Sequence, residues 1–323
     1  MTLKNWLLHG LLMVLVAVGA IACQTSPIAN PAPVDCRMVQ HPLGETCVPM
    51  QPSRVVALDH TAAVNLLSLG VMPAGVASNL LPQLAERLPD VPRLGQSAQI
   101  NLEALAVLQP DLIIGAASDL EDTYDKLSAI APTVAFEMQT TADWQQPFRF
   151  HGQVLGLEAE AEAVLEQYRQ RVETLSNQRG NPPMQVSLVR VMAQSGQIGL
   201  YLKNCFGGSI LADIGFERPP AQDEGTPDQP PFTKLISREA MTQADGDVIL
   251  LSTFGATPEI AAEAEAELER LKTDPLWQSL KAVQQNQVYL IGHYWGAGNS
   301  PLAAEWVLDD VEQYLLQSSD QEA

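Results

Sequence analysis

The chain has 323 residues and a formal net charge of −20 at pH 7. This acidity argues against a nucleic-acid partner and against electrostatic adhesion to anionic lipid, so the few basic residues carry more information than the acidic excess. About 270 residues follow Ser53, more than one hydrophobic core usually holds, which predicts two lobes.

The chain starts with the pattern of a lipoprotein signal. Residues 1–22 hold one charge, Lys4, and an apolar run from Leu11 to Val18, and small residues precede Cys23. We expect cleavage before Cys23 and acylation of its sulfur. A plain secretory signal is the alternative, and the run is short for a membrane span. Either way, the protein is expected in the periplasm or at the cell surface.

Residues 23–53 are predicted to form a tether followed by a small hairpin. Cys36 and Cys47 flank a turn-like stretch, and in an oxidising compartment a disulfide between them is expected, worth at most about 3 kcal/mol. A metal-binding pair is the rival interpretation, but no further Cys or His arrangement completes a zinc site. The remaining Cys205 is interpreted as a half-buried small hydrophobe.

From residue 54 to 157, short apolar runs alternate with helical periods, as expected for an N-terminal α/β lobe with a parallel sheet. Asn101 is expected to cap one of the helices, and Gly156 to end another. The predicted strands are Val55–Leu58, Ala74–Ala77, Asp111–Ala116 and Thr133–Phe136, and the predicted helices are Ala62–Leu69, Leu102–Leu108, Leu120–Ile130 and one ending at Leu155.

A long helix is predicted between the two halves. Apolar residues keep a 3.6-residue period from Glu158 to about Asn177, and a helix of this length spans about 30 Å. Residues 158–180 are therefore interpreted as a linking helix, although a core helix that happens to be long is the simpler alternative.

Residues 181–318 repeat the same rhythm and predict a C-terminal lobe, followed by a short tail at 319–323. The proline-rich segment Glu217–Pro231 is predicted to be a surface loop. The predicted strands are Val186–Met192, Ile198–Leu202, Val248–Ser252 and Val288–Ile291, and the predicted helices are Ser209–Ile214, Glu259–Lys272 and Pro301–Leu316.

One short pattern occurs in both halves. Ile100 lies three residues before Glu103 and Asp111 eight residues after it, and the second copy places Ile236, Glu239 and Asp247 at the same spacing. A pattern that recurs in this way indicates two lobes built alike. An acid at the same place in each lobe predicts a surface that meets a partner with two-fold symmetry.

No catalytic signature is present: the chain has no nucleophile elbow, P-loop or zincin motif. The histidines are scattered and form no bare transition-metal site, so no resident metal or cofactor is expected. An extracytoplasmic α/β enzyme and a purely structural surface lipoprotein remain alternatives.

The chain resembles the ferric-siderophore and cobalamin substrate-binding lipoproteins of ABC importers, from Cys36 to Leu316. This resemblance implies two similar lobes with mainly parallel sheets, joined by one long helix, with the ligand in a cleft between them. It implies capture of a ferric siderophore by a monomer that performs no chemistry and delivers its cargo to a permease dimer; cobalamin or haem is the alternative ligand. The segments that carry it are His41–Pro49, Pro52–Asp59, the two glutamate repeats, Ser209–Pro219 and Pro301–Tyr314.

The resemblance also implies roles for individual residues. Glu103 and Glu239 are expected to dock on arginines of the permease, although acids in the first turn of a helix also favour the helix dipole. Arg190 is expected to lead ligand binding, with an internal salt bridge as the alternative. The other expected ligand contacts are Tyr201, Tyr294 and Trp295, with weaker candidates Asp59, His60, Asn79, Tyr124 and Phe254.

Overall fold

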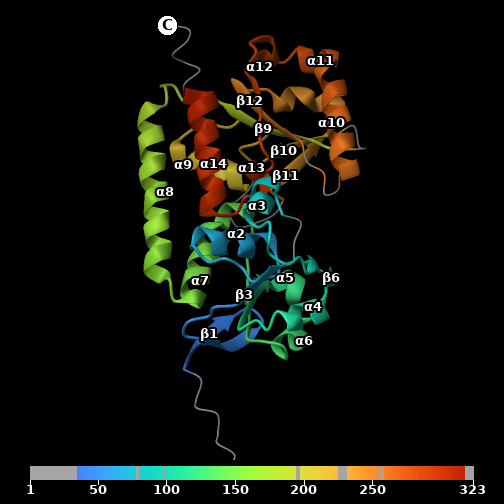
Figure 1. Ribbon diagram of the computed structural model, residues 1–323. Helices are drawn as coiled ribbons and strands as arrows, with labels where there is room; N and C mark the ends of the chain where they lie inside the picture. Colours follow the sequence, from blue (N-terminus) through green and yellow to red (C-terminus); the bar gives the residue numbers. More distant parts are fainter. Residues whose placement is uncertain are drawn as a thin grey trace, which may run out of the picture. The chain divides into compact units, whose positions relative to one another are not determined.

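The structure is a computed structural model that describes residues 35–77, 80–97, 99–193, 197–224, 231–253, 255 and 258–316 (Figure 1). The predicted signal, Cys23 and the tether as far as residue 34 lie outside these ranges, as do Asn79 and Phe254. No helix within the ranges is long and apolar enough to cross a membrane.

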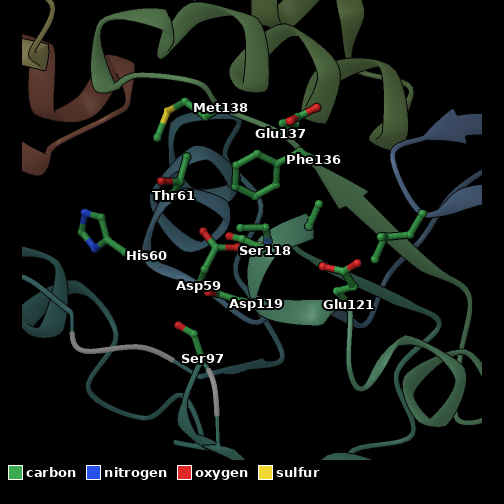
Figure 2. A pocket seen from close by; sticks show the side chains of 13 residues that line it. Asp59, His60, Thr61, Ser97, Ser118, Asp119, Glu121, Phe136, Glu137 and Met138 are labelled. Carbon is green, nitrogen blue, oxygen red and sulfur yellow. Dashed lines mark hydrogen bonds between the residues drawn. The ribbon is translucent and has the colours of Figure 1, made fainter. Parts of the chain in front are cut away.

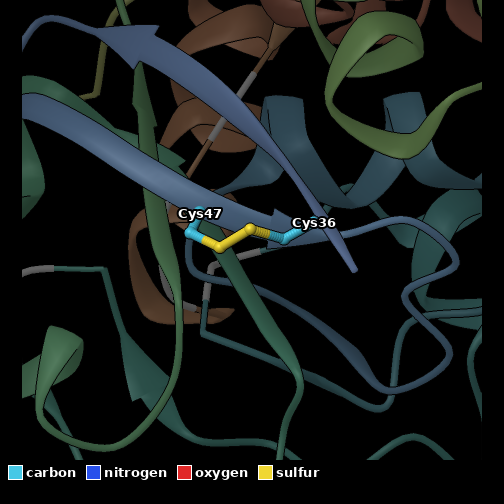
Figure 3. Close-up of a disulfide and its surroundings, with 2 residues drawn as sticks. All are labelled: Cys36 and Cys47. Carbon is cyan, nitrogen blue, oxygen red and sulfur yellow. A yellow bond between two sulfur atoms is a disulfide. The ribbon is translucent and has the colours of Figure 1, made fainter. Parts of the chain in front are cut away.

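The described residues begin with the predicted hairpin. Strands β1 (Cys36–His41) and β2 (Gly44–Pro49) pair antiparallel. The structure contains the expected disulfide between Cys36 and Cys47, whose Cα atoms lie 5.5 Å apart (Figure 3). The hairpin is fastened to the following sheet because Thr46 Oγ1 donates to the backbone oxygen of Thr133 at 2.8 Å.

Residues 55–136 form a four-stranded sheet with the order β4-β3-β7-β8, and every neighbouring pair is parallel, as predicted. Parallel neighbours need crossover segments, which place helices on both faces. The elements of this part are β3 Val55–Ala57, α2 His60–Ser68, β4 Gly75–Val76, α3 Pro82–Arg87, β5 Gly95–Gln96, β6 Gln99–Ile100, α4 Leu102–Val107, β7 Leu112–Ala116, α5 Ala117–Leu120, α6 Tyr124–Ser128 and β8 Thr133–Phe136.

A second, five-stranded sheet has the order β11-β10-β9-β12-β13. Its β9, β12 and β13 are parallel, but β10 runs antiparallel to both of its neighbours. The expected parallel rhythm is wrong here, because the connection at residues 192–197 is shorter than the dozen or so residues that a crossover needs.

The elements of this second part, with the helices that precede it, follow in chain order. They are η1 Thr141–Asp143, α7 Gln145–Leu155, α8 Glu158–Gln178, β9 Val186–Val191, β10 Ile198–Tyr201, α9 Phe206–Ile214, β11 Thr233–Ile236, η2 Arg238–Ala244, β12 Val248–Thr253, α10 Pro258–Lys272, α11 Pro275–Gln278, α12 Lys281–Gln284, β13 Val288–Leu290, α13 Tyr294–Ala297, α14 Pro301–Val311 and the π-helical turn η3 Glu312–Leu316.

The central strands of the four- and five-stranded sheets are buried on both faces, and alternate residues of a strand enter different cores. In β9, Val186 and Leu188 join a large core that also contains Val55 and Ala57 of β3, whereas Val189 enters a separate core against the C-terminal helices. Successive side chains of a strand point to opposite faces, so this alternation follows from the pleat. One continuous core therefore contacts both sheets.

Helix α8 lies against that shared core and beside α14 (Figure 1). Leu165, Tyr168 and Leu175 are buried on one side of α8 at helical spacing. On its partly exposed side, Arg171 bridges to three acids of the last helical segment, Glu305, Asp309 and Glu312. The predicted long helix thus exists at Glu158–Gln178, and its apolar stripe packs as the 3.6-residue period requires.

Two predicted helices differ from the structure. The expected helix Leu120–Ile130 is interrupted, and α5 ends at Leu120 before α6 begins at Tyr124. Glu121, Asp122 and Thr123 form the break, and Asp and Thr have low helix propensity. The last helix is α-helical only to Val311 and continues as a π-helical turn.

The prediction that Glu217–Pro231 is a surface loop is wrong in part. Within its described residues, Arg218 and Gln222 are buried. Gln222 Oε1 accepts a hydrogen bond from the backbone nitrogen of Leu188 at 2.9 Å, and its Nε2 donates to Ser187 Oγ at 2.6 Å. The side chain of Gln222 therefore satisfies polar groups of β9, which a count of prolines does not reveal.

The aspartates of the repeated pattern have the same structural task in both halves. Asp111 accepts backbone hydrogen bonds from Ser53 and Arg54, at the start of β3. Asp247 accepts one from Gln185, at the start of β9. Each carboxylate thus fixes the beginning of the strand beside its own, which gives the sequence repeat a structural cause.

Replacing Leu165 by Ala in α8 is expected to lower the free energy of unfolding by about 2–5 kcal/mol, because the side chain is fully buried in the shared core. The control Gln167→Ala, on the exposed side of the same helix, is expected to change it by less than about 0.5 kcal/mol. Urea unfolding followed by circular dichroism measures both. Equal losses in the two variants would contradict the assigned packing.

Candidate functional site

A pocket of about 570 Å³ lies where three parallel strands of the N-terminal sheet end. Its walls come from the residues that follow β3, β7 and β8, because parallel strands bring their carboxyl ends to one edge of a sheet. In the view of Figure 2, Asp59 lies between His60 and Glu121. The lining residues are Leu43, Asp59, His60, Thr61, Ser97, Ala116, Ala117, Ser118, Asp119, Glu121, Phe136, Glu137 and Met138.

Asp59 is the buried polar group at the base of this arrangement. Its Oδ1 accepts from the backbone nitrogen of Ala62 at 2.9 Å and caps α2, and its Oδ2 accepts from Ala116 at 2.9 Å. Burial and the nearby charge of Asp119 raise the pKa of Asp59 to about 7, against the lowering effect of the backbone N–H groups. Both oxygens are thus committed to holding α2 against the end of β7, and the expected ligand contact of Asp59 stays a prediction.

His60 is the next residue and faces the pocket with unused hydrogen-bonding capacity. Both of its ring nitrogens are buried and have no hydrogen-bond partner in the structure. Burial lowers the pKa of His60 to about 4, so the ring is neutral at pH 7. A neutral imidazole offers one donor and one acceptor to whatever enters the pocket.

Electrostatic interactions and hydrogen bonds between polar side chains connect His60 to the five-stranded sheet. Burial, followed by the charges of Arg190 and His60, lowers the pKa of His293 to about 3. Arg190, at the carboxyl end of β9, hydrogen bonds the hydroxyl of Tyr201, which also contacts Ser252. The structure therefore links Arg190 and Tyr201, on the paired strands β9 and β10, to His60 at the end of β3 through His293. Their expected role in a shared ligand site stays a prediction.

Tyr201 and Arg190 differ in exposure, and this difference indicates different roles. Tyr201 is 2% exposed, and burial raises the pKa of its phenol to about 12. A Cβ atom on Gly296 would collide with its ring, so the phenol is held tightly. Arg190 is only partly buried. Of this pair, Arg190 is the group with surface for a ligand, and Tyr201 fixes its guanidinium.

The structure does not support ligand contact by Trp295. Its ring is fully buried, and its indole N–H donates to Asp310 Oδ2 at 2.7 Å. Tyr294 donates to the same oxygen at 2.7 Å and packs edge-on against Trp306. Both aromatic side chains thus connect the segment after β13 to Asp310 of α14. Trp295 belongs to the core, and Tyr294 helps to hold this segment against α14.

Tyr124 also lies elsewhere than expected. Its hydroxyl is 3.2 Å from His41 Nε2 and 3.3 Å from Thr46 Oγ1, so it secures the disulfide hairpin. It does not line the pocket. Asn79 and Phe254 lie outside the described residues, and their expected roles stay predictions.

Glu103 and Glu239 both occupy exposed positions in a first helical turn. Asn101 caps α4 by accepting from Ala104 at 3.0 Å, as predicted, and places Glu103 in the first turn. Glu239 lies in the first turn of η2, where hydrogen bonds with Ser237 lower its pKa. The two acids are therefore firmly placed and accessible, and their docking role stays a prediction.

Sequence reasoning misses several residues of this region. Asp119, Glu121, Glu137 and Met138 line the pocket without being among the expected contacts. Glu137 and Met138 follow β8 directly, and Asp119 and Glu121 lie in and just after α5, the short helix that follows β7. A position soon after a strand is the available signal, and the expected contacts use it in this sheet after β3 and β4 but not after β7 and β8, where these residues lie. Arg218 belongs to the predicted surface loop, yet it donates to the backbone oxygen of Tyr201 at 2.9 Å.

The described residues contain no group of three or more metal-ligating side chains. Cys205 is fully buried, not half-buried, and its sulfur caps α9 by accepting from Gly208 at 3.2 Å. Burial raises the pKa of this thiol, which makes it a poor nucleophile. The pocket thus offers shape and hydrogen bonds, and its described lining has no nucleophile and base in hydrogen-bond reach of each other.

Comparisons with known proteins agree on one family. Residues 55–294 match the family described as periplasmic binding protein. The chain is 31% identical over 311 residues to the "probable siderophore-binding lipoprotein" of Bacillus subtilis, covering 92% of this chain and 94% of that protein. It is 29% identical to the achromobactin-binding periplasmic protein of Dickeya dadantii, over 80% and 85% of the two chains.

A solved structure extends this similarity to three dimensions. Staphylococcus aureus SirA, complexed with staphyloferrin B, matches with a TM-score of 0.74 and 27% identity. The match covers 86% of this chain and 98% of SirA. The similarity in fold therefore extends over most of the chain.

Buried neutral histidine gives a testable pH dependence. Burial lowers the pKa of His151 to about 3 in the folded protein, against about 6.5 unfolded. Between these values the unfolded chain binds a proton that the folded chain does not, so stability present above pH 6.5 is lost as the pH falls, by about 1.4 kcal/mol per pH unit.

Replacing His151 by Gln, which keeps an acceptor for Asn65, should therefore shrink the loss of unfolding free energy between pH 7 and 5.5 by about 1.4 kcal/mol. Asp59, His60 and His293 titrate in both proteins and cancel in the difference. Urea unfolding at the two pH values measures it, and an unchanged loss would show that His151 is not held neutral.

Proposed function

Because the chain belongs to the periplasmic binding protein family, we propose that it captures a ferric siderophore outside the cytoplasm and delivers it to an ABC permease. The proteins of this family bind substrates and are not enzymes, and this chain is accordingly a binding protein. The observation that carries the proposal is the similarity over nearly the whole length to a siderophore-binding lipoprotein, together with the fold shared with a siderophore complex.

The pocket is suited to a ferric ion that is already chelated when it binds. A siderophore fills the coordination shell of Fe³⁺, so the protein needs hydrogen bonds and packing surface in place of metal ligands. His60 and Arg190 supply the hydrogen bonds in this proposal, and Phe136 and Met138 supply apolar surface. The lobes 54–157 and 181–318, joined by α8, would hold the chelate between them.

The proposal includes attachment and docking. Acylation of Cys23 would anchor a monomer to the membrane, and the predicted tether that follows would give it reach. Glu103 and Glu239, exposed and in equivalent places of the repeated pattern, would each meet a basic site on the permease dimer. Release would follow when the permease binds both acids.

Replacing Arg190 by Gln is expected to weaken binding of a ferric siderophore at least about tenfold, or about 1.4 kcal/mol, because the guanidinium provides a charge-assisted hydrogen bond. Quenching of tryptophan fluorescence measures the affinity, with a panel of ferric chelates, cobalamin and haem to identify the ligand class. The control Arg179→Gln removes a guanidinium that caps the backbone of Ile214. Equal affinity in both variants would exclude Arg190 from the site, and tighter binding of cobalamin or haem would replace the siderophore as ligand.

Reversing both docking acids, Glu103→Arg and Glu239→Arg, is expected to abolish uptake of the iron complex in cells, because each would repel a basic permease site. Binding by the purified protein should be unchanged, since neither residue lines the pocket. The control reverses two exposed acids of α8, Glu160 and Glu173. Transport at the wild-type rate by the docking variant would refute the role.

A further inference from the structure

The charge of the pocket bears on the chemical class of the ligand. Four carboxyl side chains line it, those of Asp59, Asp119, Glu121 and Glu137, and no Lys or Arg is among the described residues of its lining. Glu121 and Glu137 are exposed, and Asp119 is partly buried. A ligand that enters this pocket therefore meets the exposed carboxyl groups of Glu121 and Glu137, whereas Asp59 is buried and bonded to backbone N–H groups.

The positions outside the described ranges add no compensating cation. Every Lys and Arg other than Lys4, which lies in the expected signal, falls within the described residues. The positions after residue 35 that the structure leaves undescribed, 78–79, 98, 194–196, 225–230, 254, 256–257 and 317–323, contain neither residue type.

Most of these cations are engaged elsewhere. One group forms salt bridges with carboxylates, and a second group donates to backbone oxygens. Arg87 lies over the ring of Trp306, and Lys126 is exposed on α6. The salt-bridged residues are Arg149, Arg169, Arg171, Lys203, Lys234, Arg238, Arg270, Lys272 and Lys281. The backbone-bonded residues are Arg37, Arg54, Arg93, Arg179 and Arg218.

Arg190 is the cation that the structure links to the pocket, through His293 and His60. No cation is among the causes that shift the pKa values of Asp59 and Asp119. Burial raises the pKa values of both Asp59 and Asp119, and the interactions that oppose this shift at Asp59 are backbone hydrogen bonds. The described lining of the pocket thus has four carboxyl groups, and Arg190 is linked to it through the two histidines alone.

The neutral side chain of His60 also favours a ligand without negative charge. His60 lines the pocket with two buried ring nitrogens that have no partner. A neutral imidazole can bond a carbonyl or hydroxamate oxygen without demanding a charge on the ligand. Recognition of a polyanion relies instead on several guanidinium or ammonium groups, as bidentate arginine pairs show.

We infer that the ferric chelate bound here carries no net negative charge, which makes it a hydroxamate-type siderophore with a neutral or cationic periphery. Three hydroxamates balance the charge of Fe³⁺, whereas three catecholates or a pair of citrates leave a complex strongly negative. A protonated amine on the chelate would face the carboxylates of Glu121 and Glu137, and the iron centre would face His60 and Arg190. This inference rests on the proposed function and narrows it.

The test uses the full chain in detergent and four probes. They are a linear ferric tris-hydroxamate with a free amine, the same chelate with its amine succinylated, ferric citrate and a ferric tris-catecholate. The amine form should bind at least about tenfold tighter than the succinylated form at low salt, and the ratio should shrink as salt screens the attraction. Tryptophan fluorescence quenching gives each affinity.

The double variant Glu121→Gln/Glu137→Gln should bring that ratio close to one while the folded protein remains, because only charge is removed. Glu160→Gln/Glu173→Gln on α8 loses the same charge away from the pocket and should keep the ratio. Tighter binding of citrate, the catecholate or the succinylated chelate would overturn the inference and leave the proposed function standing. Equal binding of the amine and succinylated forms would also overturn it. No binding of any ferric chelate would instead refute the proposed function, and the inference with it.

Discussion

The packing of one shared hydrophobic core determines the rest of this structure. Valines of β3 and of β9 lie in the same cluster as the buried face of α8, so the two sheets are not independent of each other. Burial of such side chains contributes about 1.5–3 kcal/mol each, which makes this contact hard to rearrange. The carboxyl ends of β3 and β9 are consequently held close enough for His60, His293 and Arg190 to influence one another.

The repeated pattern has two parts with different physical roles. Its aspartates, Asp111 and Asp247, accept backbone hydrogen bonds at the start of a neighbouring strand, which accounts for their equal spacing by structure alone. Its glutamates, Glu103 and Glu239, are exposed and hold nothing of the core together. An exposed residue that is held in place but contributes little to stability is available to bind a partner.

Electrostatics and iron chemistry fit together in the proposed role. A bare ferric ion needs several hard ligands from the protein, and the described residues bring no such group together. A chelated ion needs only recognition of the chelator, for which one guanidinium, a neutral histidine and apolar surface are appropriate. The acidic lining then selects among chelators by charge, and the buried Asp59 with its raised pKa keeps the end of β7 attached to α2.

Local patterns in the sequence by themselves determined much of this protein. The range of β8, the Asn101 cap, the long helix and the disulfide each depend on residues near one another in the chain. The family resemblance depends on several such segments and their order. Only the tertiary structure decided that Trp295 is buried against Asp310, that Tyr124 holds the hairpin, and that Asp119 and Glu137 share a pocket. Burial and electrostatic environment are set by segments far apart in sequence, so the type and spacing of a residue do not reveal them.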